Sequence, residues 1–272
     1  MAVPTIELND GTHIPQLGFG TWQVADNDAV SAVATALQTG YRHIDTAAAY
    51  GNEAGVGRAI RESGIAREDL WVTTKLWNDR HGDARAALEE SLEKLGLDRV
   101  DLYLIHWPVA GSTQRPDAWR AMIQAQEDGL VRSIGVSNFL ADNIREITDL
   151  SQVTPSVNQI EVHPTFGNEA LVRFDQDMGI ATQAWSPLGQ GKDLENPTVE
   201  QIAQRLGKTP GQVVIRWHLQ EGRIVIPKST TPARIAENFE VFDFELTPDD
   251  LAAIDGLSTD ERMGPDPAAF GQ

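Results

Sequence analysis

Four polar residues suited to moving a proton occupy comparable places in the first half of the chain. Asp45 ends a short apolar segment, and Tyr50 follows five residues later in a loop flanked by glycine. Lys75 and His106 each follow a further apolar segment. Burying a charged group at the end of a strand costs free energy unless an opposite charge compensates it. We therefore expect Asp45 to pair with Lys75.

This combination suits proton donation to an oxygen that is becoming an alkoxide. A lysine cation beside a phenol disfavours the protonated form, so Lys75 is expected to lower the pKa of Tyr50 from its reference of about 10. Asp45 would hold Lys75 in place, and His106 would donate a hydrogen bond to a substrate oxygen. Such an arrangement is typical of general acid catalysis when a hydride reaches a carbonyl.

Each of these four residues, taken singly, is more often structural than catalytic, and a strand-end Asp–Lys pair is commonly only an ion pair. Their placement at equivalent ends of three neighbouring strands reverses that balance. In a barrel of parallel strands, side chains at the carboxyl ends of adjacent strands lie about 4.8 Å apart and can touch. The pattern therefore predicts one catalytic site.

The elements that would position this site alternate between short apolar segments and amphipathic ones. The apolar segments lack period-two alternation, which is typical of parallel strands buried on both faces. Eight of them are expected as strands: 17–20, 41–44, 71–74, 100–105, 133–136, 157–160, 180–184 and 223–226. Helices are expected over 28–38, 52–62, 83–95, 117–128, 140–149, 168–178 and 198–206, with three more beginning at the Thr-Pro pairs 209–210, 231–232 and 247–248.

Eight strand–helix units in this length predict an α/β fold, a closed (β/α)8 TIM barrel. An N-terminal β-hairpin over 5–14 and extra C-terminal helices are added to it. An open doubly wound sheet is the alternative. No linker or shift in composition divides the chain, so 1–272 is expected to form a single domain.

Helix starts carry local signals. Thr198 and Gln201 have capping-box spacing, and Thr209 is followed at the third helical position by a glutamine. Thr231 and Thr247 each precede a proline in the first turn, so both are expected to cap helices.

Charge and composition exclude several classes of function. The chain has 22 Lys and Arg against 40 Asp and Glu, a net charge of −18, which disfavours nucleic acid and anionic membrane as partners. No apolar run reaches the roughly 18 residues of a membrane helix. The N-terminal residues show no secretory signal, and cysteine is absent, which fits a reducing compartment. We expect a cytoplasmic monomer that binds a small molecule.

A cofactor site is expected away from any Rossmann fingerprint, because no GxGxxG follows a strand. The loops after the seventh and eighth barrel strands offer an anion site instead, with a helix N-terminus beside them. These loops hold 186–190 and 228–230, and Arg234 follows in the next helix. Lys228 and Arg234 would supply the local positive charge that an acidic protein needs to bind a phosphate, although each alone could be an ordinary surface cation.

Several motifs in the same order resemble the aldo-keto reductase family along nearly the whole chain. They are GYRHIDTAAAYGNE (40–53), TTKLWN (73–78), DLYLIHWP (101–108), IGVSNF (134–139), NQIEVHP (158–164), WSPLGQG (185–191) and IPKS (226–229). Within the family the chain is most similar to bacterial 2,5-diketo-D-gluconate reductases, through KLWNDRHGD (75–83) and RWHLQ (216–220).

The resemblance implies a catalytic tetrad of Asp45, Tyr50, Lys75 and His106, with Tyr50 as proton donor and no metal. It also implies NADPH as cofactor, with Trp185 stacked on the nicotinamide. The other residues implied at the cofactor are Ser137, Asn138 and Gln159 at the carboxamide, Ser186, Leu188 and Gln190 in the loop, Lys228, Ser229 and Arg234 at the 2′-phosphate, and Glu237 and Asn238 at the adenine. Thr231 stands where close relatives often carry a further arginine, which implies weaker phosphate binding and some use of NADH.

Substrate contacts are expected from aromatic residues that follow strands. Trp22, Trp77 and Trp107 would line an apolar pocket for a small carbonyl compound, although any one could be packing only. Asn78 could bind a hydroxyl, and Phe270 would close over the pocket. The six histidines show no metal-binding spacing, and we interpret those at 43, 163 and 218 as structural.

The sequence thus predicts an NADPH-dependent reductase of aldehydes and ketones, with keto sugar acids such as 2,5-diketo-D-gluconate among the candidate substrates. A Schiff-base aldolase that uses Lys75 and a nucleotide-sensing subunit without turnover are the alternatives. The acidic partner of Lys75 and the basic cluster argue against the aldolase, and the complete tetrad argues against the sensor.

Overall fold

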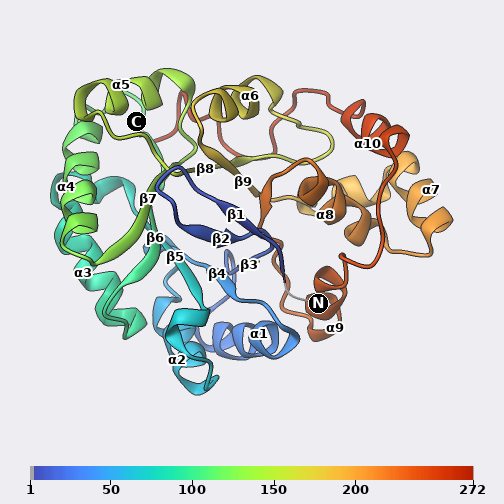
Figure 1. Cartoon of the computed structure of the whole chain (residues 1–272), viewed down its shortest axis with the longest axis horizontal. Helices are drawn as coiled ribbons and strands as arrows, with labels where there is room; N and C mark the ends of the chain where they lie inside the picture. The colour runs from blue at the N-terminus through green and yellow to red at the C-terminus, as the bar shows by residue number, and fades with distance from the viewer. Residues whose placement is uncertain (1–2, 272) are drawn as a thin grey trace.

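A closed ring of eight parallel strands forms the centre of the molecule, with helices around it, in a computed structural model that describes residues 3–271 (Figure 1). Neighbouring strands are also neighbours in the sequence, in the order β3 to β10. The ring closes where Leu17 pairs in parallel with Val225 and the amide of Gly18 donates to the Val225 carbonyl at 2.9 Å. The predicted barrel is confirmed, and the open sheet is wrong.

Most of the predicted strands lie within a residue or two of their expected positions. The barrel strands are β3 (Phe19–Gly20), β4 (His43–Asp45), β5 (Trp71–Leu76), β6 (Val100–Ile105), β7 (Val131–Ser137), β8 (Val157–Glu161), β9 (Ala181–Trp185) and β10 (Ile224–Val225). Every residue of β5 and β6 is buried, as expected for strands covered on both faces. Lys75 lies inside β5 rather than after it, because the strand continues to Leu76.

Helices connect the strands on the outside of the ring. They are α1 (Asp26–Thr39), α2 (Glu53–Glu62), α3 (Ala84–Leu95), α4 (Arg115–Glu127), α5 (Ala141–Ser151), α6 (Glu169–Asp177), α7 (Pro197–Leu206), α8 (Pro210–Gln220), α9 (Pro232–Phe239) and α10 (Pro248–Asp255). Short 3-10 segments are η1 (Ala48–Tyr50), η2 (Arg67–Asp69), η3 (Asn78–Asp83) and η4 (Gly189–Glu195). The expected helix over 83–95 therefore begins one residue later, after η3.

The predicted caps are met at two helices and not at two others. Thr209 and Thr247 each form a capping box with the third helical residue. The capping box predicted from Thr198 is wrong, because Asn196 is the capping residue and its side chain accepts from the Thr198 amide at 3.0 Å. Thr231 occupies the cap of α9, but its side chain accepts no capping hydrogen bond.

The N-terminal hairpin covers the amino ends of the strands. Its strands are β1 (Thr5–Glu7) and β2 (His13–Pro15), which pair antiparallel and lie across the barrel in Figure 1. Thr12 contacts Ser133 of β7 through their hydroxyls at 2.7 Å. Because this end is closed, ligands must approach the carboxyl ends of the strands. Between residues 3 and 271 no helix combines the length and the apolar character needed to cross a bilayer.

Candidate active site

A buried ion pair lies at the carboxyl end of the barrel. The ammonium of Lys75 lies 2.5 Å from Asp45 Oδ1, and the side chains are 0% and 2% exposed. Burial lowers the pKa of Lys75, but the Asp45 carboxylate and the Tyr50 phenol outweigh it, so the net shift is upward and the amine stays charged. The carbonyl of Thr46 also accepts from this ammonium at 2.8 Å. The pair predicted from strand ends is thus formed inside the barrel.

The phenol of Tyr50 completes the contact with the ammonium. It lies in η1, and Lys75 Nζ is 3.4 Å from its oxygen and 5.0 Å from the centre of its ring. Burial raises the pKa of Tyr50, and Lys75 opposes that shift without reversing it. The predicted lowering of this pKa is therefore wrong in its net direction, since loss of hydration penalises the phenolate more than the cation stabilises it. Tyr50 is held as a protonated donor.

His106 stands beside the phenol as a neutral imidazole. Its ring centre is 5.7 Å from that of Tyr50 and 5.1 Å from that of Trp77, both edge to face. Burial, with the Lys75 charge beside it, holds the pKa of His106 well below 6.5. Its Nδ1 has no hydrogen-bond partner among residues 3–271. A neutral ring with one N–H can donate to a substrate oxygen next to Tyr50.

Two contacts that support these groups had no signal in the sequence pattern. The amide of Gln159 in β8 donates to Asp45 Oδ2 at 2.7 Å, so both carboxylate oxygens have donors. The side-chain amide of Asn138 donates to the carbonyl of His106 at 3.0 Å. Both residues had been assigned to the cofactor through family resemblance, and the structure shows that they also brace the tetrad. Because β8 lies across the barrel from β4, only the closed ring brings Gln159 to Asp45.

Trp185, the last residue of β9, is fixed by the same asparagine. Its indole N–H donates to Asn138 Oδ1 at 2.8 Å, and the ring is half-buried. Asn138 has a left-handed backbone with φ 61°, a conformation that asparagine adopts more readily than most residues. Ser137 donates to the Gln159 carbonyl at 2.8 Å, so this group of residues forms one connected wall.

Comparison with known proteins agrees with this geometry. The model of the aldo/keto reductase family matches residues 16–259. The chain belongs to this family. It is 49% identical over 274 residues to the methylglyoxal reductase DkgA of Escherichia coli, with 100% of both chains covered.

Solved structures extend the likeness of this aldo-keto reductase to its whole length. The crystal structure of an aldo/keto reductase from Brucella melitensis superposes with a TM-score of 0.92 at 54% identity, covering 94% of this chain and 98% of the other. A mutant of Gox0644 in complex with NADPH superposes with a TM-score of 0.94 at 43% identity, covering 98% of both chains.

The loop after β9 runs through backbone conformations that few residues adopt. Ser186 and Gln190 have φ of 47° and 52°, in the left-handed region that favours glycine. The loop then turns through η4, where Gly189 has φ 56°. Strained backbone of this kind concentrates at ligand-binding segments. Both non-glycine residues were predicted to contact the cofactor, and Leu188 lies half-buried between them.

Free positive charge lies beyond the eighth strand. Lys228 and Arg234 are exposed, and neither forms an ion pair with any residue between 3 and 271. Ser229 accepts from the amide of Thr231 at 3.1 Å at the start of α9. Unpaired cations on a protein of net charge −18 suit an anion such as a phosphate.

The residues predicted at the adenine are already engaged with the protein. Glu237 accepts from the Thr209 hydroxyl at 2.9 Å, and Asn238 is buried with 6% of its surface exposed. They lie on α9, close to the start of α8. Glu237 therefore joins the cap of α8 to α9.

Aromatic side chains and the end of the chain form the substrate side. The rings of Trp107 and Phe270 pack at 4.3 Å, which places Phe270 against one of the aromatic residues expected to line the substrate pocket. Asn78 Oδ1 is buried without a partner in the described chain, and Gly271 lies beside the amide nitrogen of the same side chain. Trp22 is 44% exposed in the turn after β3, and no aromatic contact joins it to the tetrad.

Proposed function

We propose that this protein is an NADPH-dependent reductase of small aldehydes and ketones, with Tyr50 as the proton donor. The observation that carries the proposal is the buried Asp45–Lys75 pair, whose ammonium lies 3.4 Å from the Tyr50 oxygen. The similarity to a methylglyoxal reductase and to an NADPH-bound reductase supports the same cofactor and substrate class.

The side chains divide the reduction into binding and proton transfer. When bound, the reduced nicotinamide supplies a hydride, and thus both electrons, to the carbonyl carbon. His106 donates a hydrogen bond to the carbonyl oxygen and orients it toward Tyr50. As the C=O π bond breaks and negative charge grows on oxygen, the Tyr50 O–H proton passes to that oxygen and the alcohol forms. The Lys75 ammonium stabilises the phenolate left behind until water returns a proton.

The residues present fit the proposed cofactor at both of its ends. Gln159 Oε1 accepts no hydrogen bond from the described residues, so it is available to an amide N–H of the carboxamide. The half-buried ring of Trp185 offers an apolar surface for the nicotinamide. At the other end, Lys228 and Arg234 would neutralise the 2′-phosphate that distinguishes NADPH from NADH. Thr231 supplies no charge there, so we propose a preference for NADPH with weaker use of NADH.

The proposed substrates are small polar carbonyl compounds, such as methylglyoxal and keto sugar acids of the 2,5-diketo-D-gluconate type. Asn78 Oδ1 would accept from a substrate hydroxyl, because this buried oxygen otherwise lacks a donor. Trp77 and Trp107 would pack against the carbon chain. A buried acceptor without a partner favours substrates that carry a hydroxyl, as keto sugar acids do, over those that carry none, such as methylglyoxal.

The Schiff-base alternative is disfavoured by the state of the lysine. An amine must be neutral to attack a carbonyl, whereas the pKa of Lys75 is raised and its nitrogen already contacts Asp45, Thr46 and Tyr50. Borohydride is therefore expected to trap no substrate on Lys75, and trapping would favour the aldolase over the reductase.

The decisive experiment is NADPH oxidation against a panel of carbonyl compounds, with cofactor binding measured separately by fluorescence. Tyr50→Phe should lower kcat by about 10²- to 10⁴-fold, the usual contribution of a general acid, with NADPH binding unchanged. Tyr103→Phe is the matched control, because the Tyr103 hydroxyl is buried in β6 and has no partner among the described residues. Full turnover in Tyr50→Phe, or no turnover on any carbonyl compound, would refute the proposal.

A further inference from the structure

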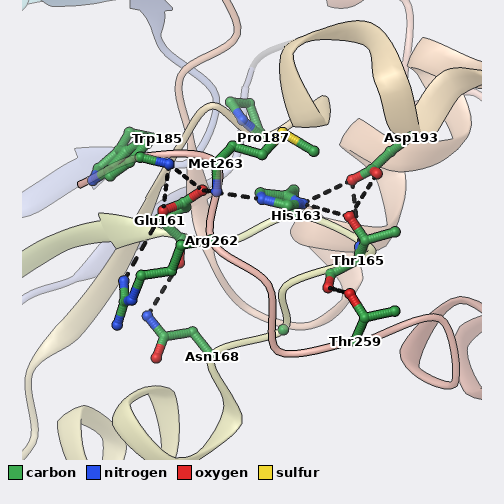
Figure 2. A network of polar contacts seen from close by, with 12 residues as sticks. Glu161, His163, Thr165, Asn168, Trp185, Pro187, Asp193, Thr259, Arg262 and Met263 are labelled. Carbon is green, nitrogen blue, oxygen red and sulfur yellow. Dashed lines mark hydrogen bonds and ion pairs between the residues drawn. The ribbon is translucent and has the colours of Figure 1, made fainter. Parts of the chain in front are cut away.

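A second buried charged cluster lies beside Trp185, at the carboxyl end of β8. Glu161, His163 and Asp193 are 0%, 0% and 2% exposed at their side chains. One imidazole bridges the two carboxylates: His163 Nδ1 is 2.8 Å from Asp193 Oδ2, and Nε2 is 3.2 Å from Glu161 Oε1 (Figure 2). We call these three residues the Glu–His–Asp bridge.

One end of the bridge holds the loop predicted to contact the cofactor. Asp193 lies in η4 and accepts from the Thr165 hydroxyl at 2.8 Å. Its carboxylate lies directly beneath Gly189, where an added Cβ would be 2.4 Å from Asp193 Oδ2. The carboxylate therefore folds the loop back on itself, just after Ser186 and Leu188. The conformation of this loop depends on the contact that His163 makes with Asp193.

The other end holds the C-terminal segment, residues 258–271, which we call the strap. The amides of Met263 and Gly264 donate to Glu161 at 2.6 and 3.1 Å, and Arg262 lies 4.0 Å from the same carboxylate. Gly264 packs on the ring of Trp185, since a Cβ there would be 2.4 Å from the indole. The strap is thus fixed to the carboxylate and to Trp185 together.

Beyond this attachment the strap reaches the substrate side. The carbonyl of Phe270 accepts from the Ala110 amide at 3.1 Å while its ring packs on Trp107, and Gly271 lies beside Asn78. One imidazole therefore lies between the loop on the cofactor side and the segment on the substrate side.

We propose that His163 is a positioning residue that couples the cofactor loop to the strap, so that NADPH bound at 186–190 orders the wall of the substrate pocket. This inference rests on the proposed function, because it takes NADPH as the ligand of the loop. No hydrogen bond or ion pair joins the bridge to a tetrad residue. Its effect passes through Asp193 to the loop and through Glu161 to the strap.

The charge on the imidazole matters for the coupling. Burial opposes the charged ring, but hydrogen bonds to Asp193 and Glu161 outweigh it and raise the pKa of His163. The charged groups facing it are those two carboxylates and Arg262 on the strap side of Glu161. The other titratable group facing it is His218 of α8, a neutral ring because burial holds its pKa well below 6.5. A charged ring donates to both carboxylates, whereas a neutral ring donates to only one. The coupling should therefore be strongest below the raised pKa and weaken as pH rises through it.

Hydrogen exchange at the Met263 and Gly264 amides tests the coupling directly in the full chain. Saturating NADPH should slow exchange of these amides about tenfold in the wild type, and Asp193→Asn should reduce that slowing to about twofold or less. The wild-type effect, corrected for intrinsic exchange, should fall as pH is raised from 7 to 9, and Asp193→Asn should show no such dependence. In steady-state assays Asp193→Asn should raise the KM of the carbonyl substrate and leave kcat within about threefold, because the tetrad is untouched.

Two further variants test whether the effect comes from the bridge. Thr259→Val is the matched control: it removes the 3.2 Å contact of the Thr259 hydroxyl with the Thr165 carbonyl, outside the bridge, and should keep the coupling. His163→Gln retains hydrogen-bonding groups without the charge and should lose the coupling in the same way as Asp193→Asn. Two results would overturn the inference, provided that fluorescence shows NADPH to be bound. In the first, NADPH does not change exchange at residues 263–264 of the wild type. In the second, NADPH slows exchange equally in the wild type and in Asp193→Asn. Failure to bind NADPH at all would instead refute the proposed function, and the inference with it.

Discussion

Replacing Lys75 with methionine should destabilise the barrel through the charge that it leaves behind. The ammonium lies 2.5 Å from Asp45 Oδ1 in a site where neither side chain is more than 2% exposed. Removing one partner of such a pair costs about 3–5 kcal/mol, because the other charge stays buried without compensation. Gln159 still donates to Asp45 Oδ2 in the variant, so the lower half of this range is expected. This is a large part of the roughly 5–15 kcal/mol that stabilises a folded protein.

The assay is urea unfolding of Lys75→Met, Asp45→Asn and the double variant. With a slope of about 3 kcal/mol per M, a loss of about 3–4 kcal/mol moves the midpoint of Lys75→Met down by about 1.0–1.3 M. The double variant carries no buried charge and should regain at least about 2 kcal/mol over Lys75→Met.

Arg120→Met is the control for this cycle. Its ion pair with Asp117 is also short, at 2.6 Å, but the side chains are 53% and 73% exposed. Loss of an exposed pair should change the free energy of unfolding by less than about 0.5 kcal/mol. If the double variant is no more stable than Lys75→Met, the cost does not come from an unpaired charge, and the electrostatic account of the site is refuted.

Three further outcomes are expected from the structure. Burial raises the pKa of Asp175 to about 7, so its carboxylate is a buried charge above that pH. Asp175→Asn should therefore stabilise the protein by about 2 kcal/mol at pH 8 and not at pH 4, as measured by urea unfolding at both pH values. Arg234→Gln should raise the KM of NADPH about 10- to 100-fold without changing that of NADH, and an equal effect on both would contradict a 2′-phosphate contact. Gly57→Ala should lower the melting temperature by several degrees, because its Cβ would lie 2.0 Å from the Leu95 carbonyl; an unchanged melting temperature would show that α2 and α3 separate freely.

The sequence pattern predicted the structure correctly where local signals and the geometry of a barrel point to the same arrangement. Continuous apolar segments between helices predicted eight parallel strands, and polar residues at their ends predicted the contact of Asp45 with Lys75. The capping box at Thr209 followed from a threonine, a proline and a glutamine at fixed spacing. At α7 the same rule failed, because Asn196 stands two residues earlier and competes for the cap.

Properties that depend on burial, and contacts between residues far apart in the chain, had no signal in the local sequence. The net rise in the pKa of Tyr50 comes first from burial, which spacing does not reveal. The contact of Gln159 with Asp45 spans 114 positions, and that of Met263 with Glu161 spans 102. His163 was interpreted as structural because the histidines show no metal-binding spacing. Its two carboxylate partners lie two residues earlier and 30 residues later in the chain, and only the folded chain brings them together.

Two buried charged clusters at one end of a barrel need an explanation other than stability. A well-packed apolar filling of the same volume is often as stable as a buried ion pair or more so. Charged hydrogen bonds, however, fix distances and directions that apolar packing leaves adjustable. The Asp45–Lys75 pair places an ammonium against the Tyr50 phenol, and the Glu–His–Asp bridge joins the loop that follows Trp185 to the strap that packs on its ring. Each cluster therefore fixes a group that the proposed reaction needs: the first fixes the Tyr50 proton donor, and the second fixes the loop and the strap beside Trp185, where the nicotinamide would lie.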